Sequence, residues 1–148
     1  MRNKRPQSSV IGAAGEHLVL SHLLRLGFIA GKTPDFTKDY DLVVINKDGT
    51  NSAPIQVKTS TSPNWMMQKK HEKPIDNLFY CFVRMSLDSL ETDIFIMDSN
   101  TVSNFVKTAH KIWLKIPARS GKKHKDVDMR KIESNFSHFK WIEKPEKY

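Results

Sequence analysis

Hydrophobic and polar positions follow two patterns along the chain, which predict one long helix near the start and several short strands after it. Apolar residues recur at helical spacing over 8–27, where we expect Ser8 or Ser9 to cap the helix and Gly27 to end it. Turn-forming residues at 46–49 predict a hairpin. Strand-like runs lie at 41–45, 55–59, 77–85 and 92–97. The last two runs are almost entirely apolar, which is typical of strands covered on both faces.

The second half of the chain is more polar and its pattern is weaker. We expect a loop at 61–74, a helix at 98–110, a strand at 111–117, a solvated loop at 118–126, a short helix at 126–133, and a tail docked by Phe136, Phe139, Trp141 and Ile142. The sequence shows no repeat and no linker. It therefore predicts one α/β domain over 1–148, with a mixed central sheet flanked by helices and a flexible basic arm at 1–7.

Two of the predicted strands carry polar residues where apolar ones would be expected. Side chains in a strand alternate between faces, so Gln56 and Lys58 share one face while their apolar neighbours share the other. The predicted hairpin can bring Asp41, at the start of the first run, within reach of both. A carboxylate, a carboxamide and an ammonium placed in this way could share one metal ion and one phosphate.

Glu16 is a further unusual residue, because it lies inside the apolar face of the predicted helix. A lone carboxylate there is costly unless it is paired, hydrogen-bonded or bound to a cation. Pairing with Lys58 or with a backbone group is one explanation, and a metal ion is the other. The small residues before it, Gly12 to Gly15, follow no strand, so they indicate close helix packing rather than a phosphate-binding loop.

Taken together, Glu16, Asp41 and the run Gln56-Val-Lys58 resemble the PD-(D/E)XK nuclease superfamily, which includes restriction endonucleases and archaeal Holliday junction resolvases. The likeness is to the fold and the active site, and it best covers the stretch from Gly12 to Ser60. This chain departs from the family pattern at Gln56, where the usual residue is acidic. The Pro-Asp of the family name is also absent, because Asp41 follows a tyrosine.

The resemblance implies a metal-dependent endonuclease that hydrolyses phosphodiester bonds of DNA, with Glu16, Asp41, Gln56 and Lys58 as its catalytic residues. Mg²⁺, or Mn²⁺, would be bound by Asp41, the Gln56 side-chain oxygen and the Val57 carbonyl, while Glu16 would hold a ligated water or a second ion. Lys58 would position the attacking water or stabilise charge on the phosphate.

Charge and composition agree with a nucleic-acid partner. The formal net charge is +8, and a basic chain favours a polyanion through counterion release. Two lysine-rich segments could follow a phosphate backbone, and Trp65 beside the first could stack on a base or instead pin its loop to the core. The residues expected to contact nucleic acid are Lys69, Lys70, Lys73, Arg119, Lys122, Lys123 and Lys125.

Three functions stay open at this point: a nuclease, a nucleic-acid-binding module of the same fold with weak or no catalysis, and a protein-interaction component of a larger complex that uses aromatics around Trp65. The single Cys81 lies in an apolar run and is expected to be a buried thiol. No signal-peptide pattern and no membrane-spanning run is present, so a cytoplasmic protein without a membrane partner is expected. A homodimer is compatible with the sequence, which does not define the assembly.

Overall fold

The computed structural model describes residues 4–133 and the backbone of 140–141. Its elements, in chain order, are α1 (Ser8–Arg25), β1 (Ile29–Lys32), β2 (Leu42–Ile45), β3 (Ser52–Ser60), β4 (Asn64–Gln68), the 3-10 helix η1 (Lys69–Glu72), β5 (Phe79–Met85), β6 (Thr92–Asp98), α2 (Ser99–Lys115), β7 (Met129–Glu133) and β8 (Lys140–Trp141). Of the predicted tail contacts, the side chains of Phe136, Phe139, Trp141 and Ile142 lie outside the described part of the chain.

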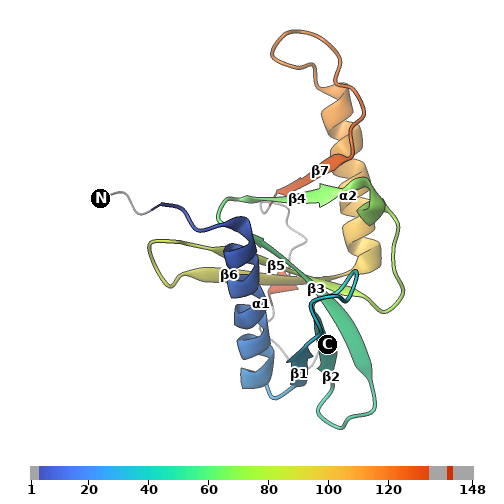
Figure 1. Ribbon diagram of the computed structural model, residues 1–148. Coiled ribbons are helices and arrows are strands. Elements are labelled where there is room, and N and C mark those ends of the chain that lie inside the picture. The colour runs from blue at the N-terminus through green and yellow to red at the C-terminus, as the bar shows by residue number, and fades with distance from the viewer. Residues whose placement is uncertain (1–3, 134–139, 142–148) are drawn as a thin grey trace.

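A six-stranded mixed sheet, in the order β1-β2-β3-β5-β6-β8, forms the centre of the molecule (Figure 1). Among the described strands of this sheet, only β3 and β5 are parallel neighbours, and β4 and η1 lie between them in the chain. The predicted hairpin is β2 and β3, which pair in antiparallel register with Leu42 opposite Ile55. The predicted α/β class, with a mixed sheet flanked by helices, is confirmed.

Two hydrophobic cores lie on opposite faces of this sheet. The alternation of side chains along β5 sends Cys81 and Val83 into the core under α1, and Tyr80 and Phe82 into the core under α2. A small second sheet of β4 and β7 covers the same face as α2. The prediction that β5 and β6 are covered on both faces is confirmed, as is the buried thiol of Cys81.

Helix α1 packs closely on β3 at Gly15. A Cβ atom at Gly15 would lie 1.8 Å from the Thr59 Oγ1 atom, so any larger residue would clash there. Close packing is therefore confirmed as the reason for a small residue at Gly15, whereas it is wrong for Gly12, where a Cβ atom would meet nothing within 4 Å. The end of the helix is also confirmed, because Gly27 adopts a φ of 86° that favours glycine. The predicted cap is wrong: Gln7 is the N-cap residue, and Ser8 already belongs to the helix.

Three predictions for the second half are wrong, and one reason explains two of them. The expected loop at 61–74 contains β4 and η1, and the expected helix at 126–133 contains β7. These two strands pair with each other, with Trp65 opposite Ile132, and bury every second residue. Most of the exposed positions hold polar residues, and the strands are short, so the alternation of buried and exposed residues could not be recognised in the sequence. The third error is the strand at 111–117, because α2 continues through it to Lys115.

Trp65 belongs to the core rather than to a binding surface. Its side chain is 1% exposed, and its indole N–H donates a hydrogen bond to the Val83 carbonyl at 3.0 Å. The prediction that Trp65 pins this segment to the core is confirmed, whereas stacking of Trp65 on a nucleic-acid base is wrong. A protein-interaction surface centred on Trp65 loses its basis for the same reason.

Candidate functional site

Asp41 is fixed where β1, β2 and β3 meet. Its backbone N–H donates to the Ile55 carbonyl at 2.8 Å, and its carbonyl accepts from the Thr33 N–H at 2.9 Å. The carboxylate Oδ2 atom accepts a third hydrogen bond, from the Val57 N–H at 2.8 Å. Beyond the paired part of β2, this side chain therefore takes the place of a neighbouring strand for β3.

The carboxyl group of Asp41 has a raised pKa. Burial disfavours its charged form, and the nearby negative charge of Glu16 acts in the same direction. The hydrogen bond from Val57 and the positive charges of Lys58 and Lys32 oppose this rise but do not cancel it. Asp41 is thus a half-buried carboxylate whose charge the protein leaves under-compensated, which favours occupation by a cation.

Gln56 and Lys58 project from β3 on the face opposite α1. Their neighbours Ile55 and Val57 pack in the core under α1, so the alternation of a strand places the two polar side chains on the other face. Burial lowers the pKa of the Lys58 amine, and the positive charge of Lys70 lowers it further, while Asp41 opposes the change. The structure therefore brings Lys58 and Asp41 into the same electrostatic environment.

Glu16 has a partner that the sequence reasoning missed. Its carboxylate forms an ion pair with the Lys32 ammonium at 2.9 Å, and this contact raises the pKa of Lys32. The prediction that Glu16 pairs with Lys58 or a backbone group is wrong, because Lys32 extends from the end of β1 to the helix. The strand that carries Lys32 has four residues and follows soon after the helix, so its alternation is too short to be recognised in the sequence.

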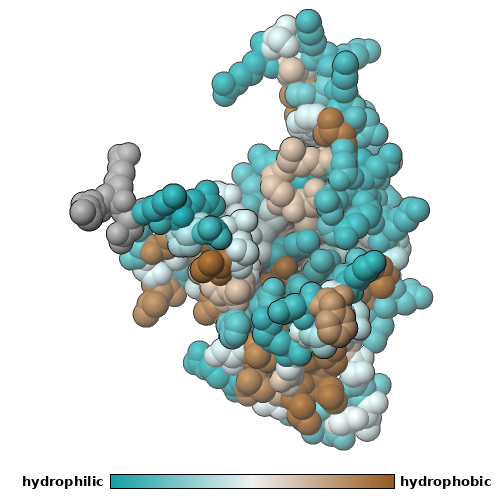
Figure 2. All heavy atoms as spheres, in the orientation of Figure 1, coloured by the Kyte–Doolittle hydropathy of each residue, from teal (hydrophilic) through white to brown (hydrophobic). Residues whose placement is uncertain are grey.

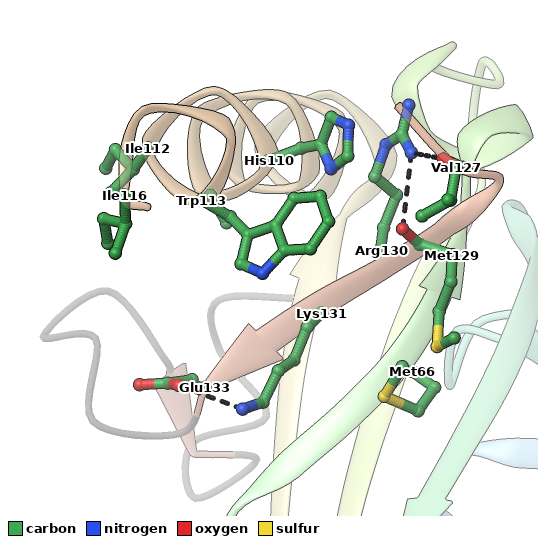
Figure 3. Close-up of a pocket in the computed structure, with 11 residues that line it drawn as sticks. Met66, His110, Ile112, Trp113, Ile116, Val127, Met129, Arg130, Lys131 and Glu133 are labelled. Atoms are coloured by element: carbon green, nitrogen blue, oxygen red, sulfur yellow. Dashed lines mark hydrogen bonds and ion pairs between the residues drawn. The ribbon is translucent and has the colours of Figure 1, made fainter. Parts of the chain in front are cut away.

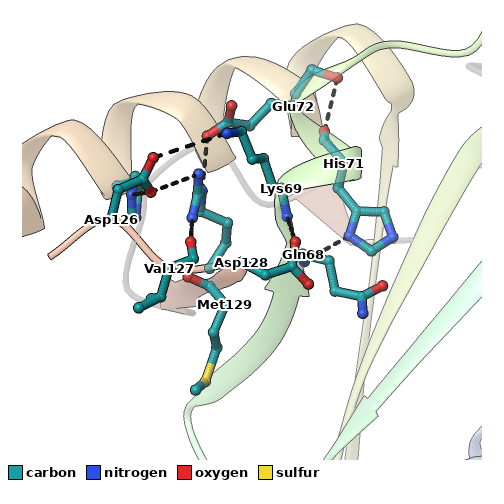
Figure 4. A network of polar contacts seen from close by, with 11 residues as sticks. Gln68, Lys69, His71, Glu72, Asp126, Val127, Asp128 and Met129 are labelled. Atoms are coloured by element: carbon teal, nitrogen blue, oxygen red, sulfur yellow. Dashed lines mark hydrogen bonds and ion pairs between the residues drawn. The ribbon is translucent and has the colours of Figure 1, made fainter.

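His71 is a second residue that the sequence reasoning did not single out. It is 4% exposed in η1, and its Nδ1 atom accepts a hydrogen bond from the Gln68 N–H at 2.8 Å (Figure 4). Burial and the positive charges of Lys58 and Lys70 lower its pKa to about 4. His71 is therefore neutral at physiological pH, with the proton on Nε2, which has no hydrogen-bond partner among the described residues.

The two lysine-rich segments meet at their bases. The Lys69 N–H donates to the Asp128 carbonyl at 2.9 Å, and its ammonium lies 3.9 Å from Asp126 (Figure 4). Buried Arg130 pairs with Glu72 at 2.8 Å and completes this junction. The remaining predicted contact residues lie exposed on the two segments: Lys70, Lys73, Arg119, Lys122, Lys123 and Lys125.

A cavity of about 450 Å³ lies away from Asp41, between the second half of α2 and β7 (Figure 3). None of the four predicted catalytic residues lines it. On its wall, the Trp113 ring stacks on His110 with centroids 5.4 Å apart and on His124 at 3.9 Å. These stacked rings hold the loop after α2 against the helix, so the cavity marks the base of the projecting segment rather than the site at Asp41.

The oxygen atoms around Asp41 suit a hard divalent cation. Asp41 has a second carboxylate oxygen beside the one bound to Val57. Gln56, the residue before Val57 in β3, carries an amide oxygen. In a strand the N–H and C=O of one residue point to the same side, so the Val57 carbonyl faces Asp41 as well. No group of three His, Cys, Asp or Glu residues forms in the part of the chain that the structure describes. Mg²⁺ is typically bound by one or two carboxylates and several waters, so the donor set fits it.

Comparison with solved structures identifies the fold. The chain is similar to a bacterial homing endonuclease, with a TM-score of 0.50 and 16% identity over 66% of this chain and 70% of the other. It is also similar to Hjc, a Holliday junction resolvase of Archaeoglobus fulgidus, with a TM-score of 0.54 and 14% identity over 88% of this chain and 91% of the other. No protein-family model and no curated protein matches the chain.

Both solved structures are nucleases of the restriction endonuclease-like PD-(D/E)XK fold, and the chain has this fold. The resemblance found in the sequence is thereby confirmed for the fold. Within the described residues, no helix combines the length and the apolar character that a membrane crossing requires.

Proposed function

We propose that this protein is a divalent-metal-dependent endonuclease that hydrolyses phosphodiester bonds of DNA. The observation that carries the proposal is the position of Asp41. Its carboxylate is fixed on Val57 at 2.8 Å, is under-compensated, and is surrounded by the charges of Glu16, Lys32 and Lys58. Glu16, Lys32 and Lys58 lie on one helix and two strands, and Asp41 lies directly before β2, so rigid elements hold the constellation.

Each residue has a distinct role in the proposed reaction. Asp41, the Gln56 amide oxygen and the Val57 carbonyl would hold Mg²⁺ or Mn²⁺, and Glu16, held in place by Lys32, would orient a water. A bound divalent ion supplies charge neutralisation at the phosphate and lowers the pKa of a coordinated water. The Lys58 amine interacts electrostatically with the same carboxylate, and its role would be to orient the attacking water or to stabilise charge that develops on the phosphate.

We further propose that the segment 107–125 provides the main DNA-binding surface. This segment is the second half of α2 and the loop after it, which project from the body of the molecule and carry a largely hydrophilic surface (Figures 1 and 2). It contains no Asp or Glu, against a net charge of +8 for the whole chain. Its cationic residues are Lys107, Lys111, Lys115, Arg119, Lys122, Lys123 and Lys125.

A matched pair of charge reversals tests this surface. Lys123→Glu on the projecting segment should weaken DNA binding and make the negative slope of log affinity against log salt less steep by about 0.9 or more, because at least one phosphate contact is lost. Lys47→Glu, an equally exposed change in the turn between β2 and β3, should leave the slope unchanged. Equal effects of the two variants on the slope would show that only net charge matters and would remove this assignment.

A catalytically weak DNA-binding module of the same fold is the second candidate, and two observations favour it. Gln56 is neutral where the family has an acid, and Glu16 is already paired with Lys32. Gln56→Glu separates the two candidates. In a slow nuclease limited by metal occupancy, the added carboxylate should lower the Mg²⁺ concentration needed for cleavage. In a binding module, it should produce no turnover at any Mg²⁺ concentration.

The proposed activity is tested by incubating the protein with plasmid, single-stranded and branched DNA while Mg²⁺ or Mn²⁺ is titrated. We expect cleavage of at least one substrate that requires the metal and stops with a chelator. DNA binding that depends on salt but never leads to cleavage, with either metal and on all three substrates, would favour the binding module instead.

A further inference from the structure

Phe36 is an exposed aromatic residue in the loop that connects two residues of the site. Its side chain is 86% exposed, although burying a phenylalanine normally contributes to stability. The loop, residues 33–41, begins directly after Lys32 and ends at Asp41. Phe36 thus lies between the ion-pair partner of Glu16 and the proposed metal ligand.

Backbone contacts close this loop and keep Phe36 near Asp41. The Thr33 N–H donates to the Asp41 carbonyl at 2.9 Å, and the Thr33 hydroxyl donates to the Tyr40 carbonyl at 3.2 Å. A tight turn, with the Thr37 N–H donating to the Pro34 carbonyl at 2.9 Å, places Phe36 at its corner. Three residues span at most about 11 Å, so the Phe36 backbone lies within that distance of Thr33 and its contact with Asp41.

The loop is also tied to η1 on the Lys58 side of the site. Asp39 adopts a φ of 69°, which is uncommon for a residue other than glycine, and its carboxylate lies 3.4 Å from the Lys70 ammonium. The negative charges of this loop act on both sides of the site, because Asp39 favours a higher pKa of Lys58 and Asp35 favours a higher pKa of Lys32. The loop is therefore a rim of the site held at both ends and at Asp39, and Phe36 is its large apolar side chain exposed to solvent.

We propose that Phe36 stacks on an unpaired nucleobase next to the phosphate that is cleaved, which gives the site a preference for DNA with a gap or another unpaired base at that position. This inference rests on the proposed function. Asp35, the residue before Phe36, repels phosphate, so the contact falls on a base rather than on the backbone. A base inside a duplex must first be unstacked, at a cost that an unpaired base largely avoids.

The test compares a fully paired duplex with the same duplex carrying a one-nucleotide gap opposite 2-aminopurine, whose fluorescence falls when an aromatic ring stacks on it. Affinity and fluorescence are measured without Mg²⁺, and cleavage is measured with it. The variants are Phe36→Ala and Phe36→Trp, with Leu90→Ala as the control, since Leu90 is fully exposed in the β5–β6 turn far along the chain from this loop.

We expect Phe36→Ala to bind the gapped duplex about 10-fold more weakly and to lose the quenching of 2-aminopurine, because stacking on one base contributes a factor of this order. Phe36→Trp should restore both, and Leu90→Ala should match the parent. Wild-type quenching that persists in Phe36→Ala, or an equal loss of affinity on the paired duplex, would overturn the inference while leaving the nuclease proposal intact. Absence of binding and cleavage by the parent chain would overturn both.

Discussion

Acid should destabilise this protein through His71, and replacement of His71 should remove that sensitivity. The folded chain holds the imidazole neutral down to about pH 4, whereas a histidine in the unfolded chain binds a proton near pH 6.5. Between these values the unfolded state binds more protons, so the free energy of unfolding falls as the pH is lowered through the window. Above pH 6.5 both states are neutral and the full stability is present.

The size of this effect follows from the width of the window. A difference of about 2.5 pH units at 1.36 kcal/mol per unit corresponds to about 3 kcal/mol lost between pH 6.5 and pH 4. Urea unfolding followed by tryptophan fluorescence at several pH values measures it. His71→Gln retains an acceptor for the Gln68 N–H and cannot titrate, so its stability relative to the parent should improve by about 3 kcal/mol as the pH falls to 4.

The control for this experiment perturbs the same place without changing a titrating group. The Ser103 hydroxyl donates to the His71 carbonyl at 3.1 Å in a buried position, so Ser103→Ala should cost about 1 kcal/mol at every pH. A difference between His71→Gln and the parent that stays constant from pH 7 to pH 4 would refute the reasoning. It would mean that His71 is protonated in the folded chain as readily as in the unfolded chain.

Two further predictions concern packing and the charged site. Gly15→Ala should destabilise the chain by about 2 kcal/mol because of the clash with Thr59. Thr59→Ala should relieve only part of this loss, because the Cβ atom that remains at residue 59 lies 2.8 Å from a Cβ at Gly15, whereas Gly12→Ala, with open space around it, should not destabilise, as urea unfolding will show. Asp41→Asn and Lys58→Met should each raise the melting temperature of the metal-free chain at pH 7, because the folded state disfavours the charge of both side chains. Both variants should also lose cleavage. A lower melting temperature would contradict the raised pKa of Asp41 and the lowered pKa of Lys58.

The hairpin that carries the site was predictable because its information is local. Gln56 and Lys58 lie two residues apart in β3. The turn at 46–49 folds β3 back against β2, the strand that begins directly after Asp41. Strand alternation and turn chemistry act over a few residues, so the sequence alone defined the faces of β3. The closeness of Gly15 to β3 was predictable for a similar reason, since small residues in a helix indicate a close neighbour.

The remaining features depend on pairing between distant segments. Lys32 pairs with Glu16, and β4 pairs with β7, although each pair is far apart in the sequence. The spacing of apolar residues within a segment does not indicate such a pairing. Each segment by itself is short and polar, and only its partner determines which residues are buried. His71 was missed for the same reason, because its burial results from the packing of η1 against α2, where the Ser103 hydroxyl bonds to its carbonyl. Tertiary packing also explains why α2 continues through residues 111–115, where Trp113 stacks on His124.

The most direct test of the proposed function measures cleavage and DNA affinity in the same variants of the site. In Mg²⁺, Asp41→Asn and Lys58→Ala should abolish cleavage and retain most of the affinity for DNA, whereas Lys47→Ala, an exposed lysine in the turn between β2 and β3, should cleave like the parent. Cleavage by Asp41→Asn at the rate of the parent would contradict the account, because the metal and the reacting phosphate would then be bound elsewhere.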